Sequence, residues 1–454
     1  MEQGQLIPEE RPEVLAERRQ ERAERRAAAD AICEPRVVKA RRDQVELRPM
    51  NLDSLIGMEH RARVVWALVE KFDLGRFYKG IKARGSKAGR SSTDPKVLLA
   101  LWLYATVSGV GKARELDRLC REHDAYRWIR GGVAVNYHTL SDFRVGLGAG
   151  LDELLTQLIG VMTHQGLVSL KRVAQDGMRV RASAGKGSFR RKRSLDKCIE
   201  AAREHVAAVK AQTGSSGEKA LSERQQAARE RAARERLERV NKALEALEEV
   251  QADRDATKKG ANDPKGEPRG SPTDAEARKM RMGDGGFRPA YNVQFATDTT
   301  SGVVVGVAVS QSRTDFDEAL PMMKQIFERT GEQPEELLVD TGYTSKDAVE
   351  KLSEAGVTVY GALPERAGHP DPYAQRAGDS TAMSDLRARM RSEEGQAIYR
   401  ERAPTAELVN ADMKTWRTLD RFWVRGKEKV LCVVLLNVLA HNFLRWMALS
   451  SAAA

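Results

Sequence analysis

Three carboxylates of this sequence stand where elements of regular structure begin or end, and together they could hold a metal ion. Asp176 ends the alternating segment 168–176, and Asp340 closes the apolar run "ELLVD". If the two segments are neighbouring strands, the carboxylates lie a few ångströms apart and repel by about 1–4 kcal/mol. Such a pair must share a proton or hold a cation. Magnesium suits the pair best, because this hard ion takes one or two carboxylates together with water and phosphate oxygens.

A third carboxylate is expected from a helix packed beside the same strands. Glu407, in "APTAELVNADMKTWR", begins such a helix, with Thr405 as its expected N-cap. Lys414 follows seven positions later on the same face, so the two could serve a metal ion and a backbone phosphate together. Each acid alone has a simpler interpretation, since an aspartate beside glycine is usually a turn residue and an early-helix glutamate is favoured by the helix dipole. Only their joint placement on one fold favours a site.

The elements that would position these acids follow from hydrophobic periodicity. Residues 54–168 are helical, and "DPKVLLALWLYATVSG" opens with Asp94 as N-cap and Pro95 in the first turn. The chain then runs in the order strand, helical insertion, two strands, helix, strand, helix, strand and helices. Three antiparallel strands followed by strands alternating with helices are typical of an RNase H-like sheet, here interrupted after its first strand. The predicted fold class is therefore α/β, an RNase H-like mixed sheet with a long helical insertion, preceded by an all-α domain.

This order divides the chain into five parts. They are a charged helical or disordered arm (1–53), an all-helical domain (54–168), an RNase H-like domain that carries the three acids in two pieces (169–188 and 271–447), a helical hairpin with a Pro/Gly linker between those pieces (189–270), and a tail (448–454). Helix pattern alone fits a scaffold as well as a DNA-binding unit for residues 54–168.

The charge balance narrows the class of partner. Lys and Arg total 76 against 65 Asp and Glu, a formal charge of +11, which favours nucleic acid or an anionic membrane surface. The most apolar run, "VLCVVLLNVLA", is far shorter than the roughly 20 residues of a membrane span, so it predicts a buried core helix. No secretory signal pattern opens the sequence, and the four scattered cysteines favour reduced thiols in the cytoplasm.

Two stretches combine basic residues in a way that suits DNA. "KGSFRRKRSLDK" places Arg190, Arg191, Lys192 and Arg193 in a row, and "KTWRTLDRFWVRGKEK" interleaves cations with aromatic residues. Those aromatics, Trp416, Phe422 and Trp423, could stack on splayed bases, although core packing is the favoured interpretation. The glycine-rich "SGVGKARE" is not a phosphate-binding loop, because the required earlier glycine is missing and Ala113 replaces Ser or Thr.

Several motifs in the same order resemble the DDE transposases of bacterial insertion sequences. The resemblance lies in "DPKVLLALWLYATVSG", "YHTLSDFR", "QDGMRVRASA", "GFRPAYNVQFATD", "LLVDTGYTS" and "YRERAPTAELVNADMKTWR", and it covers about residues 55–190 and 270–447. It implies Asp176, Asp340 and Glu407 as the metal-binding triad. It also implies that Tyr399, Arg402 and Lys414 flank the glutamate and touch the DNA backbone. One departure is that related groups place the arginine four positions before the glutamate, whereas Arg402 lies five before.

The activity that this resemblance implies is phosphoryl transfer by two Mg²⁺ ions, with Mn²⁺ as a substitute. Asp176 would bridge the ions, and Asp340 and Glu407 would each hold one. The expected partner is double-stranded DNA, at the element ends and the target site, bound by a homodimer and without a membrane. Two alternatives stay open: a non-catalytic DNA-binding regulator derived from a transposase, and a nuclease of the same fold that does not join strands.

Overall fold

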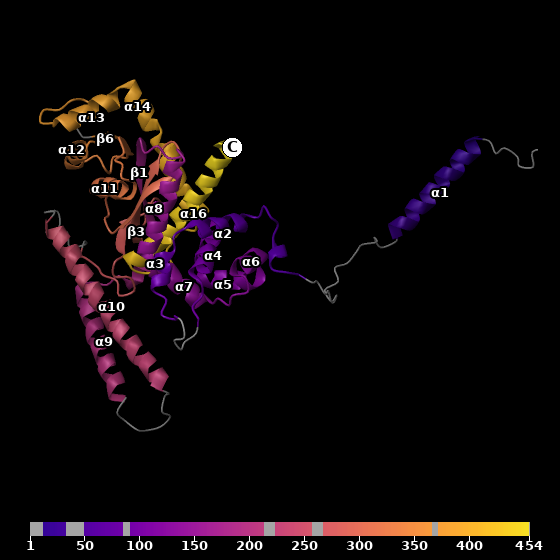
Figure 1. The fold of residues 1–454 in the computed structure, drawn as a ribbon, viewed down its shortest axis with the longest axis horizontal. Helices are drawn as coiled ribbons and strands as arrows, with labels where there is room; N and C mark the ends of the chain where they lie inside the picture. Colours follow the sequence, from indigo (N-terminus) through magenta and orange to yellow (C-terminus); the bar gives the residue numbers. More distant parts are fainter. Residues whose placement is uncertain are drawn as a thin grey trace, which may run out of the picture. The chain divides into compact units, whose positions relative to one another are not determined.

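The computed structural model describes residues 12–32, 50–84, 91–212, 223–256, 267–365 and 371–453, and the chain divides into two units. Unit 1, Met1–Met50, contains one helix, α1 (Pro12–Ile32), whose described side chains are exposed (Figure 1). Much of the arm predicted for residues 1–53 lies outside the described residues. Unit 2, Asn51–Ala454, contains all the remaining elements.

The first part of unit 2 is a bundle of short helices. They are η1 (Asp53–Leu55), α2 (Arg61–Lys71), α3 (Gly75–Lys79), α4 (Pro95–Val107), α5 (Ala113–Glu122), α6 (Asp124–Arg130), α7 (Tyr137–Gly146) and α8 (Gly148–His164). The predicted start of α4 is confirmed, since the Asp94 carboxylate accepts a hydrogen bond from the Lys96 N–H and Pro95 occupies the first turn. Nearly every side chain of α4 is buried, so this helix is the centre of the bundle.

The sheet has six strands and is mixed. They are β1 (Arg172–Arg181), β2 (Arg278–Arg281), β3 (Phe287–Asp298), β4 (Val304–Ser310), β5 (Glu336–Val339) and β6 (Thr358–Gly361). Their order is β2-β3-β1-β5-β6, and β4 pairs with the part of β3 that β2 leaves free. Strands β1, β3 and β4 are antiparallel, while β5 and β6 run parallel to β1. This is the expected RNase H-like fold, with an all-α part before it.

Helices cover the sheet and tie it to the bundle. They are α11 (Ala319–Thr330), α12 (Lys346–Glu354), α13 (Thr381–Arg391), α14 (Glu393–Arg400), α15 (Leu408–Thr415) and α16 (Lys427–Ala453). Helix α16 packs on α4, α7 and α8 of the bundle and on β4 of the sheet, so both parts share one hydrophobic core. Its most apolar window is long enough to cross a bilayer, but 67% of that window is buried inside the fold, as expected of a core helix. The bent pair α7 and α8 passes the same test only if taken as one span.

Three details differ from the sequence-based expectation. Strand β1 continues five residues beyond Asp176, because its second half pairs with the first half of β3. Strand β2 was not expected, and it makes β5, which precedes Asp340, the fifth strand in chain order. Helix α16 runs through Ala453, so the residues predicted as a tail continue this helix.

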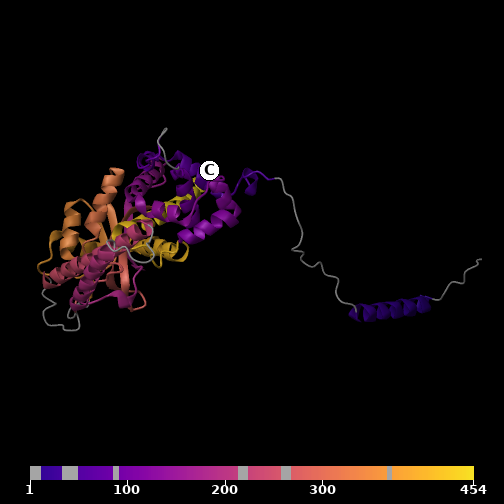
Figure 2. The same ribbon diagram turned by 90° about the horizontal axis from the view of Figure 1, so that it is seen from below.

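The insertion after β1 is a helical hairpin. Its arms are α9 (Lys192–Gln212) and α10 (Glu223–Ala256), which run side by side away from the sheet (Figures 1 and 2). The helices meet through small buried side chains, including Ala202 and Ala233. At the base, Arg190 and Gly270 exchange two backbone hydrogen bonds of 2.8 and 3.0 Å. The chain therefore leaves and re-enters the sheet domain at the same place.

Candidate active site

Strand pairing brings Asp176 and Asp340 to neighbouring positions. In the parallel pairing of β1 with β5, Ala174 stands opposite Leu338. Two residues further along each chain, the same register sets Asp176 beside Asp340, where β5 has ended and β1 continues. The Asp176 carboxyl is mostly buried, with 17% of its side chain exposed, whereas Asp340 is 42% exposed. The two aspartates predicted from the sequence are therefore adjacent at the end of β5.

Glu407 reaches this point from a helical segment with an unusual turn. Between α14 and α15, residues Ala403–Glu407 form a π-helical turn, η4, which lies against β1 and β3. Thr405, expected as an N-cap, instead lies buried inside this turn and donates to the Glu401 carbonyl. A π turn holds one more residue than an α turn. The extra residue between Arg402 and Glu407 is therefore accommodated in η4, and the two side chains stay in contact.

Arg402 is the group around which the three acids gather. Its guanidinium lies 3.4 Å from a carboxylate oxygen of Asp176, 3.9 Å from Asp340 and 3.9 Å from Glu407. The Arg402 side chain is 13% exposed, and its Nε is buried without a hydrogen-bond partner. A guanidinium can satisfy several carboxylates at once because it has five N–H donors in one plane. One cation is thus shared by three acidic side chains from three elements.

The electrostatics of Asp176 are dominated by burial. Burial raises the pKa of this carboxyl to about 6, against the opposing effect of Arg402, and the nearby Asp340 charge raises it further. Two neutral donors also hold the carboxylate: the Gly177 N–H at 2.9 Å and the Asn410 amide of α15 at 3.0 Å. The bond from Asn410 joins the helix that follows Glu407 to the strand that carries Asp176. Asp176 is therefore held in place while its negative charge remains costly.

The acids of this cluster are hard oxygen donors gathered around one positive charge. Among the described residues, no three acidic, histidine or cysteine side chains are close enough to share an ion directly. The group that they share is instead the Arg402 guanidinium. Oxygen donors that already surround a cation have the chemistry that Mg²⁺ selects. The donor set fits a divalent metal, which would compete with Arg402 for the same oxygens.

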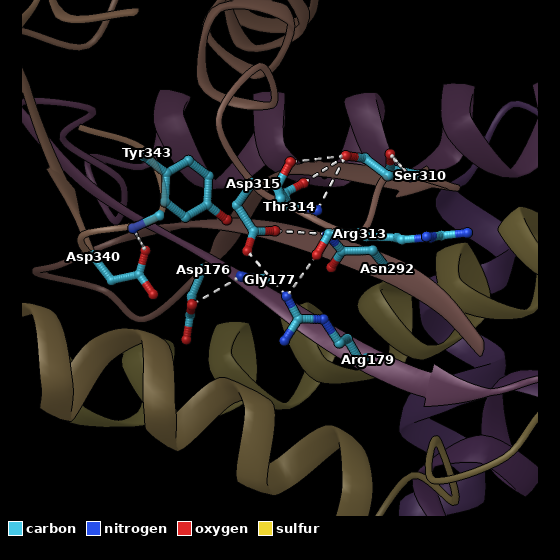
Figure 3. Close-up of polar contacts among 12 residues, drawn as sticks. Asp176, Gly177, Arg179, Asn292, Ser310, Arg313, Thr314, Asp315, Asp340 and Tyr343 are labelled. Carbon is cyan, nitrogen blue, oxygen red and sulfur yellow. Dashed lines mark hydrogen bonds and ion pairs between the residues drawn. The ribbon is translucent and has the colours of Figure 1, made fainter. Parts of the chain in front are cut away.

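A fourth acid, Asp315, lies directly behind this cluster and was not identified from the sequence. It sits between β4 and α11, and its carboxylate accepts hydrogen bonds of 2.6 Å from Asn292 and 2.7 Å from Gln294 on β3. Figure 3 shows Asp315 on the far side of Gly177 from the Asp176 carboxylate. A Cβ on Gly177 would stand 2.5 Å from an Asp315 oxygen, so only glycine allows this approach.

Asp315 is linked through Gln294 to side chains that are close in sequence to both aspartates of the cluster. The Gln294 side-chain oxygen accepts a short hydrogen bond from the Tyr343 hydroxyl, in the turn after Asp340, and a bond of 3.1 Å from Gln175, beside Asp176. Gln294, Gln175 and Tyr343 are all fully buried. The side-chain donors of this network are paired, which holds the side chains in one arrangement, whereas Gln175 Oε1 and Asn292 Oδ1 have no hydrogen-bond partner among the described residues. The signal in the sequence was "NVQ", two polar residues alternating within an apolar strand.

The helix after Glu407 is anchored through Asp412. Its carboxylate lies 2.9 Å from Nδ1 of His441 on α16 and 3.3 Å from Nε of Arg417. Burial tends to raise the pKa of Asp412, but His441 and Arg417 outweigh this effect and lower it. His441 Nε2 donates to the Gly302 carbonyl between β3 and β4. His441 is therefore a hydrogen-bonded residue of α16 that ties this helix to α15 and to the turn between β3 and β4.

The remaining residues predicted to touch DNA lie around the cluster or apart from it. Tyr399 is half-buried, and burial raises the pKa of its hydroxyl against the opposing effect of Arg402. Lys414 is exposed on α15. Four exposed residues, Arg190, Arg191, Lys192 and Arg193, lie at the base of the hairpin, where Arg191 pairs with Glu267.

The three aromatic residues of the basic stretch after Glu407 were considered either as core residues or as surfaces for stacking on bases, and they differ in burial. Phe422 is 1% exposed and packs against Tyr291, so it belongs to the core. Trp416 is 68% exposed and Trp423 is 50% exposed. Core packing was therefore the right interpretation for Phe422, while the two tryptophans face the solvent.

Two family models match this chain, and both describe transposase domains. Residues 255–443 match the family model of the transposase DDE domain, and residues 50–145 match that of a transposase domain (DUF772). The chain therefore carries a transposase DDE domain, preceded by a second domain of the transposase type. Asp340 and Glu407 fall inside the first match, whereas Asp176 precedes the hairpin and lies outside it. No curated protein and no solved structure is similar enough to match.

Proposed function

We propose that this protein is a transposase that binds the ends of its own mobile element, cuts the DNA there and transfers the strands to a target site. The observation that carries the proposal is the convergence of Asp176, Asp340 and Glu407 on one cation, in a chain that matches the family of the transposase DDE domain. Members of this family cut and join DNA and generally use a divalent metal.

The three carboxylates would hold that metal, Mg²⁺ or Mn²⁺, as two ions. When bound, such ions lower the pKa of water or a DNA 3′-hydroxyl and neutralise charge on the reacting phosphate. Asp176 would contribute to both ions because it is the central and most buried acid of the three. Arg402, released from the carboxylates, would be free to pair with a phosphate oxygen, for which a guanidinium is well suited.

The DNA would be positioned by basic side chains around the acids. Lys414 is exposed on the helix that begins after Glu407, and Tyr399 lies near Arg402. Arg190–Arg193 would extend the contact to the base of the hairpin. The formal charge of +11 supports a polyanionic substrate. Two element ends must be joined in one reaction, so a dimer on DNA is expected, and a monomeric complex holding both ends would contradict it.

The test of this function is cleavage of a DNA fragment that carries the gene's own flanking ends, in Mg²⁺. Native protein should cut at the ends, and Asp340→Ala should lower the rate by about a thousandfold or more, because metal ions supply several kcal/mol of transition-state stabilisation. A matched control is Asp347→Ala, an exposed aspartate on α12 that pairs with Lys351.

The outcomes separate the three candidate functions. Specific binding without cutting by the native protein would favour a regulator. Cutting without joined products would favour a nuclease of the same fold. Equal cutting by native protein and Asp340→Ala would mean that the proposed acids do not form the site.

Asp315→Asn is expected to weaken the metal site without removing a ligand. The substitution places an amide against the amides of Asn292 and Gln294, and so disturbs the network that holds Asp176 and Asp340. Residues behind metal ligands typically change affinity by about 10–100-fold. We expect Mn²⁺ binding, measured by calorimetry without DNA, to weaken by about tenfold, with cleavage reduced in parallel. The control Asp317→Asn makes the same chemical change at an exposed position of the same loop, and equal effects of the two would contradict this role.

A further inference from the structure

Arg144, in the last turn of α7, is a buried cation with no acidic partner. Arg144 is 6% exposed, and none of the described acids forms an ion pair with it. The guanidinium donates one hydrogen bond of 2.6 Å to the Gly111 carbonyl and lies 4.6 Å from the centre of the Trp102 ring. Its Nε is buried without any acceptor. Burial lowers the pKa of Arg144 to about 10, which reflects the cost of a charge that lacks a counter-charge.

Arg144 faces a small hollow where the helical bundle meets the segment that follows α15. We call this hollow the seam pocket; it is lined by Gly111, Arg144, Arg417, Thr418, Arg421 and Trp423, among others. Its free space is about 20 Å³, room for roughly one water-sized atom. The helical bundle and the segment after α15 approach closely here: a Cβ on Gly111 would collide with the Thr418 hydroxyl. A single oxygen atom fits the hollow, whereas a whole phosphate group does not.

The charges around the seam pocket are all positive. Its lining contains three arginines and no acidic side chain. Arg417 is already paired with Asp412 and donates to the Val107 carbonyl at the end of α4. At the surface beside the pocket, Arg421 and Lys112 both lie against the exposed Trp423 ring, at 5.1 and 4.7 Å from its centre. Arg144 and these two exposed cations are therefore available to an anion.

We propose that the seam pocket binds one phosphate group of the DNA backbone, with one anionic oxygen at Arg144 and the others at Arg421 and Lys112. A backbone phosphate suits the pocket because only part of the anion can enter, while the rest must remain at the surface with the DNA. This inference rests on the proposed function for its source of phosphate. It adds a contact at the seam between the helical bundle and the segment that directly follows α15.

The test measures DNA binding of Arg144→Met over a range of salt concentrations, in EDTA so that no cutting occurs. The probes are a duplex with the gene's flanking ends and an unrelated duplex of equal length. Each phosphate neutralised adds about 0.9 to the slope of log affinity against log salt. We expect Arg144→Met to lower that slope by about one and to weaken binding of both duplexes by about tenfold near 100 mM salt. The melting temperature of the free variant should not fall, because methionine removes an unpaired buried charge and fills the same space.

Exposed variants make the test independent of folding. Arg421→Gln and Lys112→Gln remove charge at the surface of the pocket and should lower the slope in the same direction. Lys324→Gln, an exposed lysine paired with Glu328 on α11, removes one charge elsewhere and should leave the slope unchanged. A native slope for Arg144→Met and for the double variant Arg421→Gln/Lys112→Gln would overturn the proposal.

Inorganic phosphate separates the two sources of the anion. If phosphate alone raises the melting temperature of native protein but not of Arg144→Met, while their DNA slopes are equal, the pocket takes free phosphate and the DNA assignment is wrong. Failure of the proposed function would look different. Native protein would then not cut its flanking DNA, whereas the loss of slope in Arg144→Met would still support a phosphate contact.

Discussion

Asp176→Asn is expected to stabilise the metal-free protein at neutral pH and to abolish DNA cleavage. The pKa of the Asp176 carboxyl is raised from 3.8 to about 6, chiefly by burial, so the folded protein binds a proton that the unfolded chain has lost. Below pH 3.8 both states are protonated and the group has no effect on stability. Between pH 4 and 6 the native protein loses stability as pH rises, and the loss is complete above pH 6. The asparagine variant does not lose stability in this way, because its side chain carries no charge at any of these pH values.

The size of this effect follows from the rise of the Asp176 pKa from 3.8 to about 6, since each tenfold change in the acid dissociation constant corresponds to about 1.4 kcal/mol. After allowing for the hydrogen bonds from Gly177 and Asn410, which asparagine meets only in part, we expect a gain of about 2 kcal/mol in the free energy of unfolding at pH 7.5. Denaturant titrations in EDTA at pH 4 and pH 7.5 measure it. A variant less stable than native protein at pH 7.5 would contradict the assignment of a costly charge.

The same substitution should remove the response to metal. Mg²⁺ that binds the folded state raises the melting temperature of native protein, and a variant without the central carboxylate should lose most of that rise. Cleavage should fall by about a thousandfold or more, since one negative ligand of the metal is gone. Stability gained and activity lost in one variant would distinguish a catalytic group from a structural one.

Arg402→Gln is expected to tighten metal binding while it slows DNA cleavage. The guanidinium shares the oxygens of Asp176, Asp340 and Glu407, so it competes with any cation for them. Without it the three carboxylates carry uncompensated charge, and Mn²⁺ affinity measured without DNA should rise by about tenfold or more. Cleavage should fall by about a hundredfold, because the proposed pairing of Arg402 with the reacting phosphate is lost.

The matched control is Arg400→Gln, an exposed arginine at the end of α14, two residues before Arg402. It removes the same charge and should change neither quantity by more than about twofold. Weaker Mn²⁺ binding by Arg402→Gln would mean that the arginine organises the carboxylates for the metal rather than competing with it.

The main part of the site could be predicted because it depends on strand order. The succession of strands and helices made β1 and β5 neighbours, and the observed register then sets Asp176 beside Asp340. The extent of β1 could not be predicted, since its second half is held by β3, more than a hundred residues away. Glu407 could be assigned to a helix start by its pattern, but not to a π turn, because side-chain periodicity does not count residues within one turn.

The residues that sequence reasoning missed depend on long-range register. Asp315 can be recognised only from the folded chain. There Asn292 and Gln294 of β3 donate to its carboxylate, and Gly177 of β1 has no Cβ to block its approach. Arg402 was identified from the sequence, but only the structure shows that the π turn lets it reach Glu407 from one position further away than in related groups. Arg144 carries no motif at all. Its isolation from acidic side chains is a property of the packed structure alone.

The base of the α9–α10 hairpin has a consequence for how this protein can vary. Because Arg190 and Gly270 are hydrogen-bonded to each other, everything between them begins and ends at one point of the catalytic domain. The entropy of closing such an excursion grows only with the logarithm of its length. The hairpin is therefore an interchangeable cassette: lengthened, trimmed or replaced, it would leave the pairing of β1 with β3 and β5 undisturbed.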